Sequence, residues 1–266
     1  MLKNITIGQY YPGSSPLHKA DPRTKIIIAF IFVVALILIN TLPGFVMYSL
    51  FTLGAIIISN VPLKYTLKGL KPILFVIIFA AVLNIFFNSS GKELFKYGFI
   101  HITDQGLHSA LIMIFRITLL VVGVSLLTLT TTPIMLTDGI EKLMKPLNRI
   151  GLPVHEIAMM MTIALRFIPT LLEETDKIMK AQAARGADFD TGNIIQRAKS
   201  FIPVLVPLFI SAFRRADELA IAMESRCYRG SVGRTRMKVL RYGKIDGLIM
   251  AVVFMFVFLT LFLQYM

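Results

Sequence analysis

Long apolar runs constrain the fold of this chain more than any other feature of its sequence. A helix needs about 20 predominantly apolar residues to cross the hydrocarbon core of a bilayer, with a range of roughly 17 to 25. The run at 107–129 meets this requirement, and the run at 247–262 is nearly free of polar residues. Because 56% of the residues are hydrophobic and only 16% are charged, the composition lies far from that of a soluble domain. The chain is therefore predicted to be an all-α membrane protein.

The apolar runs are separated by residues that break helices. The stretch 26–59 is interrupted at 40–44, where Pro43 and Gly44 predict a tight turn between two short crossings. We expect about five crossings in all, two of them within 26–59 and the others at 72–87, 107–129 and 247–262.

The distribution of charge predicts how the chain is oriented. Its net charge is +13, and basic residues concentrate next to the apolar runs, as in 226–244, which has seven Lys and Arg and no acid. Such flanks mark the cytoplasmic side of a membrane and attract anionic lipid, so this charge does not call for nucleic acid as a partner. We expect a multi-pass protein of the plasma membrane with its N-terminal segment, 1–25, in the cytoplasm.

The region 132–242 differs in kind from the rest. Residues 130–244 hold 18 of the 28 Lys and Arg and 11 of the 15 Asp and Glu, and no clean apolar run there reaches 18 residues. Three amphipathic helices are expected, at about 133–149, 153–184 and 193–226, lying along or beneath the membrane. As an alternative, 157–172 and its neighbour form a further pair of crossings. The predicted domains are 1–25, the crossings of 26–131, a cytoplasmic domain at 132–242, and a C-terminal crossing at 243–266.

A motif is written twice within this charged region. An Asp precedes an Arg by nine residues in each copy, Asp176 with Arg185 and Asp217 with Arg226, and the tripeptide Phe-Ile-Pro lies upstream of both. Each Arg ends a helix-forming run, where its side chain can satisfy free carbonyl groups of the last turn. Alternatively, each guanidinium projects past its helix into an acidic groove of another protein, since its planar fork suits a carboxylate. Two such arms indicate two similar docking sites.

The chain lacks the usual signatures of catalysis. No glycine-rich phosphate loop ending in Gly-Lys-Ser or Gly-Lys-Thr is present, so the chain is not expected to hydrolyse ATP. The single Cys227 and four unclustered His residues give no disulfide framework and no metal site. Arg116 lies within the fourth apolar run, where a structural contact inside the bundle and a role at a partner surface both remain open. An enzyme that uses Arg116 with the His residues of the outer loop, His101 and His108, is the least favoured reading.

The N-terminal segment 17–25, Leu-His-Lys-Ala-Asp-Pro-Arg-Thr-Lys, and the two Arg motifs give the chain a family resemblance over nearly its whole length. It resembles the transmembrane T component, EcfT, of energy-coupling factor (ECF) transporters for vitamins and other micronutrients. The resemblance rests on Ala184-Arg185-Gly186 and on Ser225-Arg226-Cys227, the latter extended by Tyr228-Arg229-Gly230.

The resemblance implies a coupling role without catalysis. Each Arg motif would dock on one of two ATP-binding-cassette subunits, which bind the ATP and Mg²⁺, and a small membrane S component would capture the substrate. This chain would hold no cofactor. The family often has Gly after the second Arg where this chain has Cys227, which restricts the backbone there. The alternative is a conventional ABC importer permease that lines its own substrate path, which two docking arms in one chain disfavour. The sequence does not name the substrate.

Overall fold

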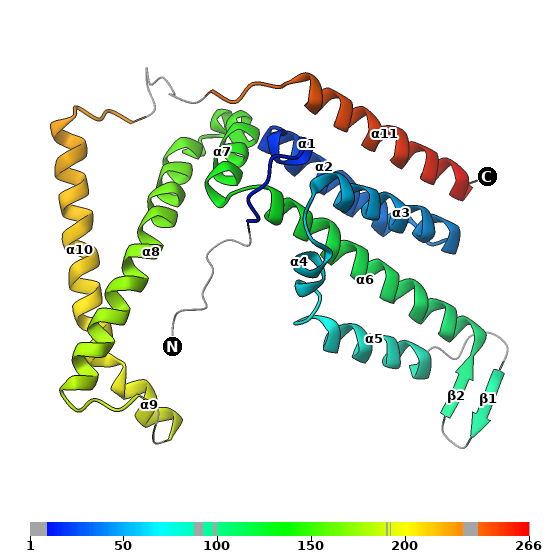
Figure 1. Ribbon diagram of the computed structural model, residues 1–266, viewed down its shortest axis with the longest axis horizontal. Coiled ribbons are helices and arrows are strands. Elements are labelled where there is room, and N and C mark those ends of the chain that lie inside the picture. The colour runs from blue at the N-terminus through cyan, green and yellow to red at the C-terminus, as the bar shows by residue number, and fades with distance from the viewer. Residues whose placement is uncertain are drawn as a thin grey trace. The chain divides into compact units, whose positions relative to one another are not determined.

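The computed structural model describes residues 10–87, 93–97, 100–189, 191, 193–230 and 239–265. The described residues form two compact units (Figure 1). The bundle unit contains 10–143 and 239–265, so the C-terminal helix belongs with the N-terminal half of the chain. The paired-helix unit contains 144–230.

The bundle unit consists of helices and one short β-hairpin. Asp21 caps the first long helix and Pro22 occupies its first turn, where the missing N–H of proline costs nothing. The elements are α1 (Pro16–Lys19), α2 (Pro22–Leu38), α3 (Leu42–Ser59), α4 (Leu63–Lys68), α5 (Leu74–Phe87), β1 (Glu93–Tyr97), β2 (Ile100–Thr103), α6 (Asp104–Thr130), α7 (Pro133–Met144) and α11 (Lys244–Tyr265).

The predicted turn at 40–44 is confirmed. Helix α2 ends at Leu38, and α3 begins at Leu42 with Pro43 in its first turn. Gly44 permits the close return of the chain, because a Cβ there would lie 2.7 Å from the side chain of Ile39.

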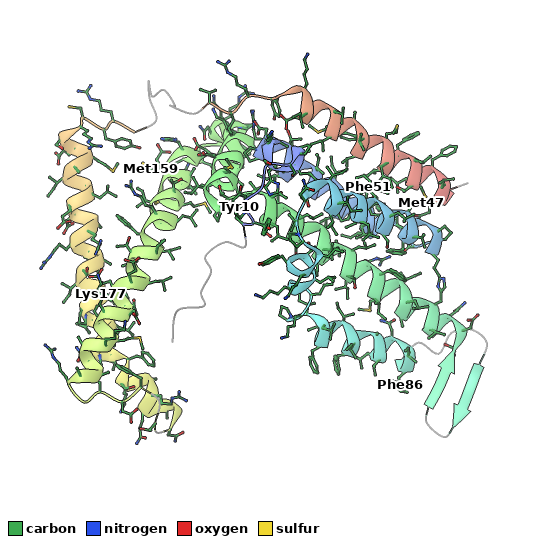
Figure 2. The ribbon with its side chains drawn as sticks, viewed as in Figure 1. Tyr10, Met47, Phe51, Phe86, Met159 and Lys177 are labelled. Atoms are coloured by element: carbon green, nitrogen blue, oxygen red, sulfur yellow. The ribbon has the colours of Figure 1, made fainter. Side chains whose placement is uncertain are left out.

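The core of the bundle unit lies where α2, α3 and α6 meet. Its buried members include Phe32, Leu36, Phe45 and Tyr48. Helix α11 packs against this core, and its Phe256 stacks on Phe51 with ring centroids 4.2 Å apart. Phe51 is labelled in Figure 2. The all-α class is therefore confirmed, and the two antiparallel strands β1 and β2 are a minor addition in the loop before α6.

The paired-helix unit contains two long helices. Its elements are the 3₁₀ helix η1 (Lys145–Ile150), α8 (Val154–Ala184), α9 (Ile194–Ser200) and α10 (Ile202–Ser225). The helix expected at 153–184 is thus found almost as predicted, whereas the one expected at 193–226 is divided at Phe201 into α9 and α10.

Five helices of the described residues are long and apolar enough to cross a membrane, which matches the expected number. The set differs from the expected one. Helices α3, α6 and α11 belong to it, but α2 and α5 are shorter, with 17 and 14 residues. The other two are α8 and the stretch Ile195–Ser225, which contains α10 and most of α9, so by length and composition the alternative of two further crossings there stays open. Length and composition alone therefore do not determine whether α8 and α10 cross the bilayer or lie at its surface, which depends on how they pack.

Candidate functional site: two arginine-ended helices

Helices α8 and α10 pack against each other in antiparallel directions (Figure 1). Near the end of α8, the side-chain amide of Gln182 donates to the carbonyl of Pro203 at the start of α10, at 3.4 Å. Near the start of α8, the sulfur of Met159 (labelled in Figure 2) accepts a hydrogen bond from the hydroxyl of Tyr228, which follows α10; the distance is 3.0 Å. The end of each helix therefore lies beside the beginning of the other.

A polar cluster holds the middle of the pair. Glu174 of α8 accepts a hydrogen bond from the hydroxyl of Ser211 and forms an ion pair with Arg215 at 2.9 Å, both on α10. The hydrogen bond from Ser211 and the charge of Arg215 hold the pKa of Glu174 below its ordinary value. Both charged side chains are partly exposed, so the cluster sets the register of the helices more than it stabilises them.

The antiparallel pairing of α8 with α10 argues against a model in which both helices cross the bilayer. Each helix is apolar in its first half and charged in its second, so the charged half of α10 lies beside the apolar half of α8. If 154–171 crossed the hydrocarbon, the contacts of Glu174 with Arg215 and of Met159 with Tyr228 would bring the charged stretch from Arg215 to Glu224 into it as well. A charged side chain costs about 3 kcal/mol near the bilayer centre, where Glu224 would lie, and less toward the edge. An amphipathic pair that lies at the membrane surface avoids this cost.

Both helices end in the same backbone geometry, with Arg185 and Arg226 as the C-cap residues. The next residue is left-handed in each case, with φ of +88° at Gly186 and +55° at Cys227. This is the Schellman arrangement, in which backbone N–H groups satisfy carbonyls of the last turn. The closing hydrogen bonds run from Gly186 N to Ala183 O (3.0 Å), Ala187 N to Gln182 O (3.0 Å), Cys227 N to Glu224 O (2.8 Å) and Tyr228 N to Met223 O (3.0 Å).

The guanidinium groups of the two arginines have no polar partner among the residues that the structure describes. Arg185 and Arg226 are exposed, and neither side chain makes a hydrogen bond or ion pair with a described residue. The interpretation that they satisfy the carbonyls of their own helices is therefore not supported. The remaining residues predicted for the motifs are small and exposed as well, namely Ala184, Gly186, Ser225 and Cys227.

The antiparallel pairing separates the two arginines. Arg185 lies beyond the end of α8, next to the start of α10, and Arg226 follows the last residue of α10. Helix α10 has 24 residues, so at 1.5 Å per residue the two ends are about 36 Å apart. The two motifs therefore lie at opposite ends of the helix pair, separated by the length of one helix.

Because one left-handed position holds Gly186 and the other Cys227, exchanging the two residue types tests how each cap contributes to stability. A residue with a Cβ in this conformation costs about 1 kcal/mol more than Gly. The exchange Cys227→Gly should therefore raise the free energy of unfolding by up to about 1 kcal/mol, and Gly186→Cys should lower it by a similar amount. No atom lies within 4 Å of a Cβ added at Gly186, so crowding does not contribute. Thermal unfolding of both variants measures these changes. If both substitutions raised, or both lowered, the free energy of unfolding, the prediction would be contradicted.

Arg116 has a structural role in the bundle unit. Its guanidinium donates to the carbonyl of Ile39 at 2.7 Å and to the side-chain oxygen of Asn40 at 2.8 Å, just after the end of α2. The interpretation as a contact inside the bundle is confirmed. His18 is half-buried and forms hydrogen bonds with Ser15 Oγ at 2.7 Å and with the carbonyl of Tyr11 at 2.9 Å, which holds the N-terminal segment in place.

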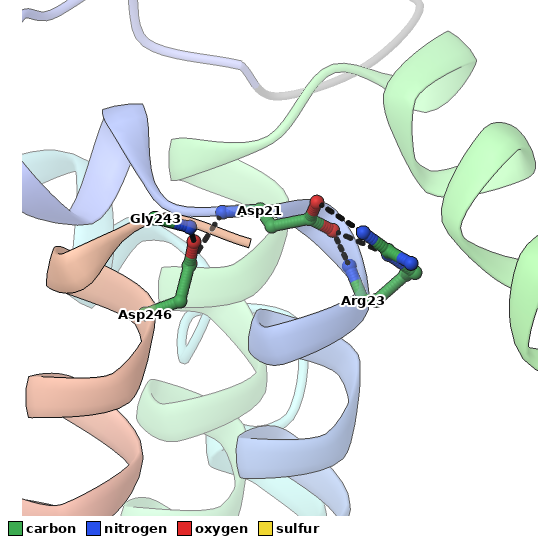
Figure 3. Close-up of polar contacts among 4 residues, drawn as sticks. All are labelled: Asp21, Arg23, Gly243 and Asp246. Carbon is green, nitrogen blue, oxygen red and sulfur yellow. Dashed lines mark hydrogen bonds and ion pairs between the residues drawn. The ribbon is translucent and has the colours of Figure 1, made fainter. Parts of the chain in front are cut away.

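A polar cluster that the sequence did not predict joins the two ends of the chain (Figure 3). The carboxylate of Asp246, at the start of α11, accepts hydrogen bonds from the backbone N–H groups of Asp21 and Gly243, each at 2.7 Å. Asp21 in turn pairs with Arg23 at 2.9 Å. Burial raises the pKa of Asp21, but the hydrogen bonds and charge of Arg23 outweigh this and hold it below its ordinary value. The only signal in the sequence was an acidic residue at the edge of an apolar run.

Together these features define a class of protein. A helical membrane bundle is combined with two antiparallel amphipathic helices, and each of these exposes an arginine at its end. In the described residues, no group of His, Cys, Asp and Glu is placed to hold a metal ion. The class is that of a helical membrane protein with a pair of amphipathic helices.

Comparison with known proteins identifies the family. Residues 13–239 match the CbiQ family, described as cobalt transport protein. The chain is 60% identical to an "Energy-coupling factor transporter transmembrane protein EcfT" of Ruminiclostridium cellulolyticum, over 100% of this chain and 99% of the relative. It is 58% identical to the EcfT of Clostridium kluyveri over 92% of each chain. With the EcfT of Bacillus subtilis it shares 47% identity over 95% of this chain and 96% of the relative. The chain therefore belongs to the CbiQ family and is a transmembrane component of the energy-coupling factor type.

Proposed function

We propose that this chain couples two ATPase subunits to a substrate-binding membrane protein and performs no catalysis itself. The observation that carries the proposal is the identical cap geometry of two exposed arginines about 36 Å apart, a distance that follows from the 24 residues of α10. Two equivalent anchors at that separation suit two copies of one kind of subunit. Each guanidinium would pair with a carboxylate in a groove of its ATPase, where small neighbouring residues allow close approach.

The pairing of α8 and α10 supports transmission of movement between the two anchors. A displacement at either end passes along a rigid helix and through the Glu174, Ser211 and Arg215 cluster to the other helix. ATP and Mg²⁺ would be bound by the ATPase subunits. In this proposal the N-terminus, α8 and α10 lie on the cytoplasmic side of the plasma membrane, consistent with the basic flanks.

The exposed apolar surface of the paired helices supports a membrane protein as the third partner. Large apolar side chains exposed in numbers mark an interaction surface or contact with lipid. On α8 and α10 they are Ile157, Met160, Met161, Ile168, Ile202, Leu205, Val206, Phe209, Ile210, Phe213 and Ile221. Unbranched methionines adapt to different or moving partners, as expected of a surface on which a small S component for a vitamin or other micronutrient would move.

Purification from native membranes tests the proposal. We expect this chain to co-purify with two ATPase subunits and a small hydrophobic protein, with the stoichiometry given by native mass spectrometry. The isolated chain should show no ATP hydrolysis, while the assembled complex should hydrolyse ATP. Recovery of the chain as a dimer with its own substrate path would support the conventional permease instead.

A further inference from the structure

The bundle unit is packed unevenly along its length. At one end, Phe32, Leu36, Phe45 and Tyr48 fill the space between α2, α3 and α6. Toward the other end, beside the N-terminal segment, the helices diverge around a partly open cavity of about 620 Å³. Helices α2, α3, α6 and α11 all contribute to its lining, which includes Ile28, Gly54, Ile58, Leu127 and Ile249.

The cavity is too large to be a packing defect. Protein interiors contain few voids larger than a water molecule, and the lining of an unfilled void loses its dispersion contacts. Its volume is within the range of small-molecule sites, about 300 to 1,000 Å³. The protein therefore gains stability if a molecule of matching chemistry occupies the space.

The apolar lining favours a hydrocarbon chain as the ligand of the cavity. The walls are almost wholly apolar. One charged group contributes to them, Lys25, and its ammonium is already held by the carbonyls of His18 and Thr130 and by the hydroxyl of Thr131, at 3.0 to 3.2 Å. A polar substrate would lose its hydration without compensation. Ordered water would also lack the partners that it needs.

The surroundings of the cavity indicate the source of that hydrocarbon. Three of its lining helices, α3, α6 and α11, are long and apolar enough to cross a membrane, so lipid chains are the adjoining medium. This end of the bundle also exposes basic groups, because Lys19 adjoins the lining residue Ala20 and Lys244 adjoins the lining residue Ile245. The two carboxylates nearby, of Asp21 and Asp246, are buried. The exposed charge is therefore positive and suits a phosphate group.

We propose that this cavity binds one acyl chain of an anionic phospholipid, with the phosphate outside at Lys19 and Lys244. The bound chain would complete the packing of α11 against α2 and α3 at the end of the bundle that side chains leave open. The site is separate from the two arginine-ended helices and does not depend on the proposed coupling function.

A pair of glycine substitutions tests the proposal. An added side chain at Gly54, within the lining, meets no atom within 4 Å, and the same holds for Gly247, which is exposed on α11 outside the lining. The full-length protein in detergent would be titrated with phosphatidylglycerol and bound lipid counted by native mass spectrometry. We expect one tightly retained lipid in the wild type, binding at least tenfold weaker in Gly54→Leu, and unchanged binding in Gly247→Leu. If Gly54→Leu does not fold, Ala55→Leu replaces it, since Ala55 also lines the cavity.

A second comparison tests the position of the phosphate. Replacement of both Lys19 and Lys244 by Ala should weaken binding of phosphatidylglycerol several-fold and leave binding of phosphatidylcholine unchanged. Equal retention of phosphatidylglycerol by Gly54→Leu and Gly247→Leu would overturn the proposal. So would the absence of any retained lipid in the wild type, or a cavity occupied by a helix of a partner protein in the assembled complex.

Discussion

Reversal of charge at either arginine, Arg185→Glu or Arg226→Glu, is expected to abolish most substrate uptake and to release an ATPase subunit from the complex. Both side chains are exposed and make no hydrogen bond or ion pair with the described residues, so the change should leave the fold intact. An arginine anchor at the centre of an interface contributes 2 kcal/mol or more, which corresponds to a roughly 30-fold weaker complex. Reversal would also place a carboxylate against the proposed acidic groove, so the loss should be larger. The double variant should retain no ATPase subunit.

Arg214→Glu is the matched control for these variants. Arg214 is exposed on α10 but lies in the middle of the helix pair, away from both ends. It should therefore keep most ATPase binding and uptake. Co-purification of ATPase subunits and uptake by reconstituted vesicles measure both effects. Full uptake by Arg185→Glu and Arg226→Glu would exclude the docking role, and equal losses in all three variants would indicate a general effect of charge.

Removal of the Asp246 side chain is expected to have the largest effect on the stability of the bundle unit. Its carboxylate is 4% exposed and accepts two backbone hydrogen bonds of 2.7 Å, from Asp21 and Gly243. A hydrogen bond to a charged group contributes about 1.5 to 3 kcal/mol, and an unsatisfied buried donor adds a further penalty. Asp246→Ala should therefore lower the free energy of unfolding by about 3 kcal/mol or more. Asp246→Asn should lose less, because its amide retains one oxygen acceptor.

Asp104→Ala is the control for this prediction. Asp104 is also an acidic residue in the first turn of a long apolar helix, but its side chain is exposed. Its expected contribution is a favourable interaction with the helix dipole, of about 0.3 to 1 kcal/mol. Thermal unfolding in detergent compares the variants. Similar losses for Asp104→Ala and Asp246→Ala would mean that the contact between the chain ends contributes little.

The helices and their ends were predictable because the interactions that define them are local. Pro43 and Gly44 placed the turn between α2 and α3 correctly, and the helix expected to end at residue 184 does end there. The division at Phe201 was missed. The Phe-Ile-Pro repeat drew attention to 201–203 without indicating a break, although Pro203 favours the start of a new helix.

The sequence did not show which apolar helices are long enough to cross a membrane. It favoured α2 and α5 on apolarity, whereas length and composition select α8 and Ile195–Ser225, and the packing of α8 on α10 argues against a crossing by that pair. Composition cannot distinguish a crossing from an amphipathic surface helix when both reach 18 residues. The distinction depends on which residues lie side by side, and that is a property of packing.

The sequence by itself determined the class of protein, the existence of two arginine-ended helices and the absence of familiar catalytic motifs, because each of these depends on residues close together in the chain. Only the tertiary structure decided that α8 and α10 run antiparallel, which separates Arg185 from Arg226 by the length of a helix. It also decided that Asp21 bonds Asp246, 225 residues away, and that one end of the bundle is hollow. Such features result from long-range packing, in which many partners of similar polarity compete, and local preference does not select among them.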